Sequence, residues 1–326
     1  MSPLVSIIIP VYNTGEFLEE CLNSVRSQTL RDIEIICVND GSTDNSSEIL
    51  AAFAAKDERI RVIDRPNGGE LAARNSGIHA ATGQWLGFID SDDKAAPDMF
   101  ERLLANGENY QADISHCGLM YFYPDGRTVP HYGTGTLKQQ DHDTGLLDLL
   151  SGSQVEPSMC CKLYRRELFE DFYISDRILY NGDLYCNFTL FQKAHNAVYE
   201  DFCGYLYRQR HYSDITNVQS VKKMRGILNV RREILKMSSP AIHDAAYRLW
   251  LSTLVNTLNL ASVSSDPNAS EFYDECQTLL KTEKENIHLL DRKQQIAAAL
   301  HLTSPLLARL SYKIYGSHTL SHYEQR

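Results

Sequence analysis

The sequence predicts an α/β fold: a mostly parallel, Rossmann-like sheet followed by a helical C-terminal region. Within the first hundred residues, short apolar runs typical of strands alternate with stretches whose apolar side chains recur at helical spacing. Polar turns rich in Gly, Asn and Asp follow the apolar runs, and from about residue 221 the patterns are helical. Regular alternation of strand and helix implies right-handed crossovers and therefore a mostly parallel sheet.

The first strand is expected at residues 4–10, a run that is apolar on both faces, as in a parallel sheet covered on two sides. Pro10 should end its hydrogen-bond ladder. Between residues 118 and 155 the chain turns polar and Gly-rich, which predicts a hairpin and a mobile loop. Further strands are expected at residues 33–38, 60–63 and 85–90, with helices at 17–25, from about 45, at 70–81 and from about 97.

Composition excludes several classes of protein. Of the 326 residues, 43% are hydrophobic and 23% are charged, as in ordinary soluble globular proteins. The formal net charge of −10 argues against a nucleic-acid partner. The start of the chain lacks the basic region of a signal peptide, and no apolar run reaches transmembrane length, so a cytoplasmic location is expected. The 8 cysteines include no Cys-x-x-Cys pair, so buried, reduced thiols are expected.

Three carboxylates, Asp90, Asp92 and Asp93, directly follow the apolar run at residues 85–89. Carboxylates this close repel one another unless a cation or hydrogen-bond donors compensate. A divalent cation such as Mg²⁺ or Mn²⁺ would suit oxygen ligands and is often shared with the phosphates of a substrate. The alternative is structural, because Asp92 or Asp93 would also serve as the N-cap of the helix expected near Pro97.

Polar turns follow four of the expected strands. They are Tyr12-Asn13, Asp40-Gly41, Asn67 to Gly69, and Asp90 to Asp93. In a parallel sheet these strand ends lie along one edge, so the turns should line one crevice. Neither a Gly-x-Gly-x-x-Gly nor a Walker motif occurs in this region, which disfavours dinucleotide and P-loop chemistry. A nucleotide bound here would need a metal on the carboxylates to balance its phosphates.

The same turns carry four motifs that resemble family 2 glycosyltransferases, enzymes of the GT-A fold that are mostly inverting and dependent on UDP-sugars. The motifs lie at residues 5–13 (VSIIIPVYN), 38–44 (VNDGSTD), 73–77 (ARNSG) and 89–93 (IDSDD). The resemblance covers residues 4 to about 102, resumes at 161–166 and 207–208, and fades after about 217. It implies a GT-A domain at residues 1–219, with a nucleotide-sugar half at about 1–110 and an acceptor half at about 111–219, before a helical region at 220–326.

The resemblance also implies roles for individual residues. Pro10, Tyr12 and Asp40 would contact uracil and ribose, with Arg74 nearby, and Asp40 is expected on an exposed turn. Asp90 and Asp92 would form the Asp-x-Asp element, and Asp92, with Asp93 as its rival, would reach the metal. The full set expected to bind the nucleotide is Pro10, Tyr12, Asn13, Asp40, Asn67, Arg74, Asp90 and Ser91.

Inverting transfer is a single displacement at the anomeric carbon, so it requires one carboxylate as general base for the acceptor hydroxyl. Asp183 is the candidate base. Related enzymes tend to carry Glu-Asp here, whereas this chain has Gly182-Asp183, which casts doubt on acceptor specificity. The alternatives are that Asp183 only caps the helix that follows it, and that Asp176 is the base.

Two further segments are candidates for the site. The basic stretch at residues 205–211 would return from the far side, where Arg210 or His211 would touch the diphosphate or complete the metal shell; a solvated strand end is the alternative. Lys162, inside an apolar run, would pair with an acid of the site.

Helical patterns are expected from residue 221 to about 258, at 271–280, at 287–300 and at 304–316. In the last one, Leu306, Leu307, Leu310 and Ile314 share one side, with Arg309 and Lys313 around them. A basic amphipathic helix can lie on an anionic membrane surface. The alternatives are packing on its own domain or on a second subunit, which would give a homodimer. The resemblance adds that a lipid-linked glycan at the inner face of the membrane would be an acceptor.

The sequence therefore predicts a metal-dependent inverting glycosyltransferase that moves a sugar from a UDP-sugar to a hydroxyl of a glycan, in bacterial surface polysaccharide synthesis. Two alternatives stay open. One is a catalytically weak, transferase-like protein that binds UDP or carbohydrate, for which Gly182 is the best argument. The other is a nucleotidyltransferase, which would usually show a Gly-rich loop with Arg and Lys after the first strand.

Overall fold

The computed structural model describes residues 3–131, 134–152, 155–174, 180–209 and 220–316. Its contacts divide the chain into two compact units, Met1–Arg177 with Gly182–His211, and Ile178–Asn181 with Tyr212–Arg326. The domain boundary expected at residues 219 and 220 adjoins residues 210–219, which lie outside the described residues. The division at that point stays a prediction.

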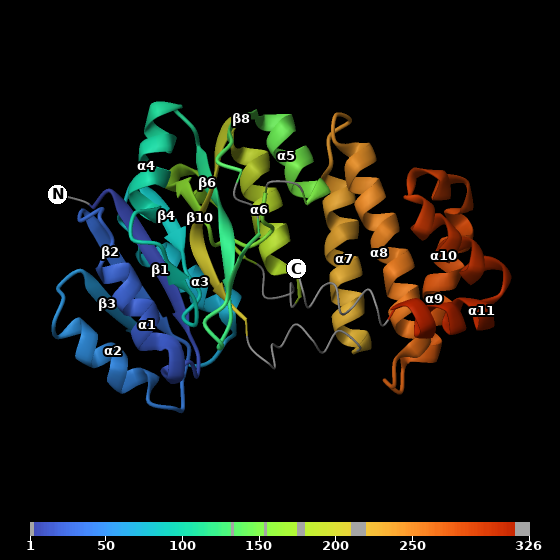
Figure 1. Cartoon of the computed structure of the whole chain (residues 1–326), viewed down its shortest axis with the longest axis horizontal. Coiled ribbons are helices and arrows are strands. Elements are labelled where there is room, and N and C mark those ends of the chain that lie inside the picture. Colours follow the sequence, from blue (N-terminus) through green and yellow to red (C-terminus); the bar gives the residue numbers. More distant parts are fainter. Residues whose placement is uncertain (1–2, 132–133, 153–154, 175–179, 210–219, 317–326) are drawn as a thin grey trace. The chain divides into compact units, whose positions relative to one another are not determined.

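The first unit is built on a single sheet to which ten strands of the described residues contribute (Figure 1). The order is β3-β2-β1-β4-β9-β6-β10-β5, with β7 beside β6 and β8 beside β10. The strands are β1 (Val5–Val11), β2 (Ile33–Asn39), β3 (Ile60–Asp64), β4 (Trp85–Phe88), β5 (Lys94–Ala95), β6 (Ile114–Phe122), β7 (Thr128–Pro130), β8 (Leu137–Asp141), β9 (Lys162–Arg165) and β10 (Asn196–Arg208). The first four strands pair in parallel, as do β6 and β10, while β9 runs antiparallel between β4 and β6. The mostly parallel sheet predicted from the sequence is therefore confirmed.

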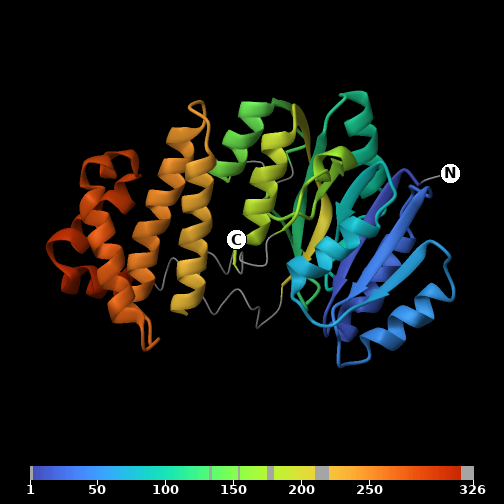
Figure 2. The ribbon, with the colours of Figure 1, turned by 180° about the vertical axis from the view of Figure 1, so that it is seen from behind.

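Helices cover both faces of this sheet. Figure 1 shows α1 and α2 on one face, and Figure 2 shows α3 on the other. The helices of this unit are α1 (Gly15–Arg26), α2 (Ser46–Ala54), α3 (Glu70–Ala80), α4 (Met99–Asn109), α5 (His142–Ser151) and α6 (Gly182–Lys193), with a 3-10 turn η1 (Arg166–Phe169). Gly77 lets α3 approach β1 closely, because a Cβ there would lie 2.4 Å from a methyl carbon of Ile8. This close approach carries α3 to the edge where the strands end.

Two local expectations are wrong. Pro10 does not end β1, which continues to Val11. Its missing N–H faces β4, and pairing with β4 stops at Ile8, so no ladder hydrogen bond is lost there. Neither Asp92 nor Asp93 caps the next helix, because the short strand β5 intervenes and Asp98 precedes α4.

The segment expected to be a hairpin and a mobile loop contains more structure than predicted. The hairpin is present as β6 and β7. It is followed by β8 and by α5, whose N-cap Asp141 accepts a hydrogen bond from the Thr144 N–H at 2.8 Å. The cysteines are all free in the described residues, and Cys203 alone among them is only partly buried.

The second unit is helical, as expected. It consists of α7 (Val221–Met237), α8 (His243–Val263), α9 (Ala269–Thr282), η3 (Lys284–Leu289), α10 (Arg292–Thr303), α11 (Pro305–Ser311) and the π-helical turn η4 (Tyr312–Gly316). Trp250, Leu254 and Leu258 of α8 lie in its apolar core. The single helix expected at residues 287–300 is interrupted, because Asp291 caps a new helix by accepting from the Gln294 N–H at 2.9 Å. Among the described helices, none combines the length and apolarity needed to cross a membrane.

Candidate active site at the carboxyl ends of the strands

The polar turns after β1, β2 and β4 meet at one edge of the sheet. The Asn13 side chain accepts a hydrogen bond from the Thr43 N–H at 2.7 Å, which ties the first turn to the second. The Thr14 hydroxyl donates to Ser91 at 2.9 Å, which ties the first turn to the last. The sequence prediction that these turns share one crevice edge agrees with this geometry. Tyr12, Asn13 and Asn67 are exposed there, while Pro10 and Ser91 are buried.

Asp40 is buried, so the expectation that it lies on an exposed turn is wrong. Its carboxylate accepts hydrogen bonds from the N–H groups of Gly68 and Gly69, the latter at 2.7 Å, and lies 3.4 Å from the Arg65 guanidinium. Only 2% of Asp40 is exposed. These hydrogen bonds hold the turn before α3 in place. The turn includes Gly69, whose φ of +86° favours glycine.

Arg74 of α3 joins three carboxylates at this edge. Its guanidinium is fully buried; one terminal nitrogen donates to Asp183, and the other lies 2.9 Å from Asp90 and 2.5 Å from Glu70. Removal from water alone would lower the pKa of Arg74, but these carboxylates raise it well above its usual value. The planar guanidinium is suited to this arrangement because its nitrogens reach separate partners at the same time.

The first turn of α6 approaches α3 at Gly182, the neighbour of Asp183. A Cβ on Gly182 would lie 2.9 Å from the end of the Leu71 side chain, so a larger residue there would require that side chain to move. One oxygen of Asp183 accepts from Arg74 and the other from the Met159 N–H at 3.2 Å. Asp183 lies inside the first turn of α6 and its carboxylate is directed at these partners, which disagrees with a role as helix cap alone. Its side chain is 30% exposed, so it stays accessible.

Strand β10 returns to the site as predicted, and it contributes contacts that sequence reasoning missed. The Tyr205 hydroxyl donates to Asp93 at 2.7 Å and accepts from the Asp90 N–H at 3.2 Å. The Arg208 N–H donates to the other oxygen of Asp93, and its guanidinium donates to the Asp92 carbonyl, both at 2.7 Å. Burial and the nearby charge of Asp90 raise the pKa of Asp93 to about 8. These contacts fix the backbone of the Asp-x-Asp turn.

The acidic turn after β4 was expected to hold a cation. Within the described residues, no cluster of three or more His, Cys, Asp or Glu is placed to hold a metal. Asp92 is half-buried with a hard oxygen donor, whereas Asp93 uses both oxygens on Tyr205 and Arg208. Mg²⁺ is commonly held by one or two carboxylates together with substrate phosphates. Three other candidates, Asp176, Arg210 and His211, lie outside the described residues.

Lys162 does not pair with an acid, contrary to expectation. Its buried ammonium donates to the carbonyl oxygens of Glu156 and Ser158, both at 2.7 Å, and more weakly to that of Cys160 at 3.4 Å. Burial lowers the pKa of Lys162. The backbone of residues 156–160 therefore wraps around the ammonium, and this loop supplies the Met159 N–H that contacts Asp183.

The sheet, its acidic edge and its covering helices define a protein of the GT-A fold. The structure of Staphylococcus aureus TarS 1-349 in complex with UDP-GlcNAc superposes with a TM-score of 0.74 at 18% identity, and the match covers 98% of this chain and 92% of that one. The model of the glycosyl transferase family 2 matches residues 6–173. The chain belongs to this family, which confirms the resemblance of its sequence motifs.

Named relatives agree with the assignment. The uncharacterized glycosyltransferase EpsJ of Bacillus subtilis is 41% identical over 213 residues, which are 64% of this chain and 62% of that protein. Glycosyltransferase GlyG of Streptococcus pneumoniae is 32% identical over 254 residues, or 75% of this chain and 81% of that one. The poly(ribitol-phosphate) beta-glucosyltransferase of Bacillus spizizenii is 38% identical over 171 residues, which cover 51% of this chain and 26% of that protein.

Proposed function

We propose that this chain transfers a sugar from a UDP-sugar to a hydroxyl of a glycan acceptor, with inversion at the anomeric carbon and with Mg²⁺ or Mn²⁺ as cofactor. The observation that carries the proposal is the buried Arg74, which joins Asp90 on the expected nucleotide side to Asp183. A nucleotide-binding carboxylate and a candidate base are thereby held at one edge of the sheet. The UDP-GlcNAc bound to TarS and the polymer named for the Bacillus spizizenii relative support a UDP-sugar donor and a bacterial surface polysaccharide as acceptor.

Asp183 has the properties that a general base needs. Arg74 and the Met159 N–H fix the orientation of its carboxylate, while part of the side chain remains open to an acceptor hydroxyl. In inverting transfer this carboxylate would take the hydroxyl proton as the oxygen attacks the anomeric carbon and the bond to UDP breaks. No covalent intermediate on the protein is required.

Asp92 would hold the cation, because its side chain is partly exposed, whereas Asp93 is buried and accepts hydrogen bonds from Tyr205 and Arg208. When bound, the cation supplies Lewis-acid stabilisation of the leaving diphosphate. Tyr12, Asn13 and Asn67 expose side chains at the same edge and would meet the uridine. Pro10, Asp40 and Ser91 are buried, so we propose that their main effect is on the shape of the turns that receive the nucleotide.

Packing weakens the non-catalytic alternative. Its main support was the absence of a Glu before Asp183. Gly182 lies against the Leu71 side chain of α3, which gives a packing reason for a small residue at that position. The nucleotidyltransferase alternative disagrees with the family assignment.

The test compares Asp183→Asn with Asp92→Asn in the full chain, using a panel of UDP-sugars and surface glycans. Asp183→Asn should lower transfer by roughly 10²–10⁴-fold, the usual effect of losing a general base, with UDP affinity nearly unchanged. Asp92→Asn should lower metal-dependent UDP binding and transfer together. Calorimetry with UDP, with and without EDTA, separates the two. Wild-type transfer by Asp183→Asn would exclude it as the base, and equal UDP affinity with and without metal would exclude the cation.

A further inference from the structure

In the C-terminal unit, helix α11 and the π-helical turn η4 that follows it direct an apolar face away from that unit. Leu306, Leu307, Leu310 and Ile314 are 69%, 55%, 47% and 61% exposed, respectively. Their spacing of one, three and four residues places them on the same side of the helix. Ala308, in contrast, is 2% exposed. The helix therefore packs into its own unit through a small side chain and leaves its large ones outside.

This arrangement reverses what a surface helix normally shows. Helices of globular proteins turn their leucines toward the core and their polar side chains toward water. Here α11 contacts α8 and α10. Contiguous exposed apolar side chains of this kind mark an interaction surface. We define the binding face as Leu306, Leu307, Leu310 and Ile314.

The charges around the binding face are basic. Between residues 291 and 314 the chain has four Lys or Arg and one Asp, although its net charge is −10. Arg309 and Lys313 lie four residues apart along one flank of the apolar side, and both are exposed. The acid, Asp291, is used as the cap of α10. None of the four cations forms an ion pair within the described part of the chain.

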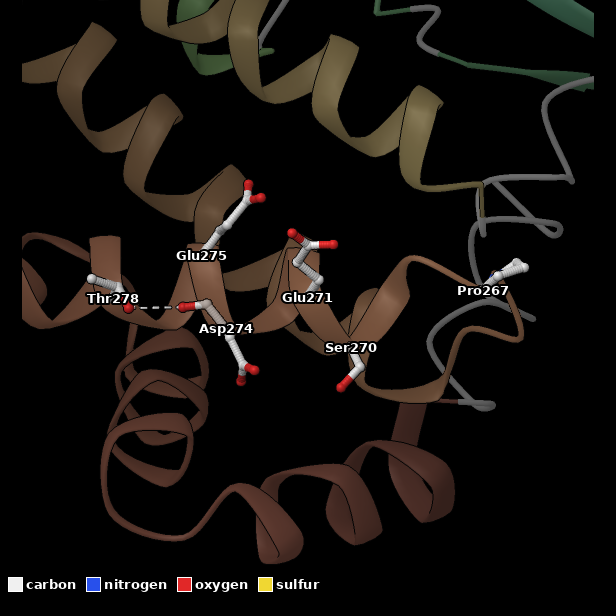
Figure 3. Close-up of a pocket in the computed structure, with 6 residues that line it drawn as sticks. All are labelled: Pro267, Ser270, Glu271, Asp274, Glu275 and Thr278. Carbon is white, nitrogen blue, oxygen red and sulfur yellow. Dashed lines mark hydrogen bonds between the residues drawn. The ribbon is translucent and has the colours of Figure 1, made fainter.

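Three acidic side chains of this unit lie on α9. Figure 3 shows Glu271 and Glu275 on one side of that helix and Asp274 on the other. They line a shallow hollow with Pro267, Ser270 and Thr278. Glu275 is paired with Arg225 at 2.7 Å, so these acids do not converge on a common point.

We propose that the binding face docks on the surface of an anionic lipid bilayer. Its leucines would enter the boundary between headgroups and acyl chains, while Arg309 and Lys313 would contact lipid phosphates. A second copy of this chain suits the surface less well, because a two-fold interface would bring the same basic flank against itself. The proposal concerns lipid binding and is independent of transferase activity.

The experiment measures flotation of the full chain with vesicles of phosphatidylcholine alone and with vesicles that also contain phosphatidylglycerol. Binding is expected only to the anionic vesicles and should weaken with salt. Arg309→Glu with Lys313→Glu should lower it by at least about 25-fold, since each cation near such a surface contributes about fivefold. Leu306→Ser with Leu310→Ser should lower it by about tenfold or more, because the buried apolar area is lost. Leu147→Ser, at a leucine of α5 that is 39% exposed, is the matched control and should bind as the wild type does.

Unchanged melting temperatures would show that the variants fold, as expected for exposed positions. The proposal is overturned if the wild type floats with neither vesicle, or if either double variant floats like the wild type. It is also overturned in favour of a second copy if the wild type is a dimer that Leu306→Ser with Leu310→Ser converts to a monomer. A chain shortened to residues 1–316 that floats when the full chain does not would show that residues 317–326 cover the face, which likewise refutes the proposal for the full chain.

Discussion

Arg74→Lys keeps a positive charge among three carboxylates but removes the branched guanidinium, whose terminal nitrogens reach separate carboxylates. In the wild type, different terminal nitrogens serve Asp183 and Asp90. A lysine ammonium is a single point of attachment on a flexible stem and cannot occupy both positions. One of the two carboxylates should therefore lose its donor, and the orientation of Asp183 should become less defined.

The size of the effect follows from the contact that is lost. A hydrogen bond to a charged group contributes about 1.5–3 kcal/mol. Asp90 and Asp183 are 29% and 30% exposed, so water can replace part of the lost contact. We therefore expect the lower end, about 1.5 kcal/mol, which corresponds to roughly a tenfold loss of transfer rate. The same loss should lower the melting temperature by about 3–6 °C.

The assay is a double-mutant cycle on transfer rates with Arg74→Lys, Asp183→Asn and the two combined, alongside thermal unfolding. If Arg74 acts by orienting Asp183, Arg74→Lys should cost little once Asp183 is already Asn. Fully additive losses would refute the coupling between these residues. Arg127→Lys is the control, because it makes the same exchange at an exposed arginine of the hairpin turn and should leave the rate unchanged. Asn106→Asp is not a suitable control, because Asn106 donates a hydrogen bond to Glu200.

Three further predictions concern other parts of the chain. Tyr205→Phe removes the hydroxyl between Asp93 and the Asp90 N–H, so metal-dependent UDP affinity should fall by about tenfold; unchanged affinity in calorimetry would contradict this positioning role. Asp40→Ala should lower the free energy of unfolding by about 2–4 kcal/mol, because two glycine N–H groups lose their acceptor, and denaturant titration with Asp40→Asn as the milder variant measures it. Burial lowers the pKa of His301 to about 4, below the value near 6.5 of an unfolded chain, so the folded state binds fewer protons between these values. Stability from this residue is present above about pH 6.5 and lost as pH falls toward 4; His301→Gln should flatten that dependence in melts at pH 7 and 5.

The strand ends were predictable from the sequence because each apolar run stops at a polar turn, and parallel topology then places the turns together. The contacts that shape the site were not predictable in the same way. The Asp183 carboxylate accepts a hydrogen bond from Arg74, 109 residues away in the sequence. Next to Asp183, Gly182 lies against the Leu71 side chain of α3. Tyr205 reaches Asp93 across 112 residues. No local pattern encodes either distance.

Two errors have a common physical origin. A lysine inside an apolar run looks the same in sequence whether its ammonium meets a carboxylate or backbone carbonyls, and Lys162 meets carbonyls. Asp40 in a Gly-rich turn looks exposed, yet the N–H groups of the next turn bury its carboxylate. In both residues the hydrogen-bond partners are main-chain groups, which leave no trace in the residue types of a sequence.

In the loop held by Lys162, backbone groups make the contacts with the ammonium and with Asp183, so some side chains of the loop can vary while these contacts stay. All three acceptors of its ammonium are carbonyl oxygens, so the partly exposed side chains of Glu156 and Ser158 can be exchanged while the cation keeps its partners, whereas Cys160 is buried. The Met159 N–H that contacts Asp183 is likewise a backbone group. A library of side chains on this loop would then alter what lies beside Asp183 without moving the carboxylate, which makes the loop a place to redesign acceptor preference on a fixed frame.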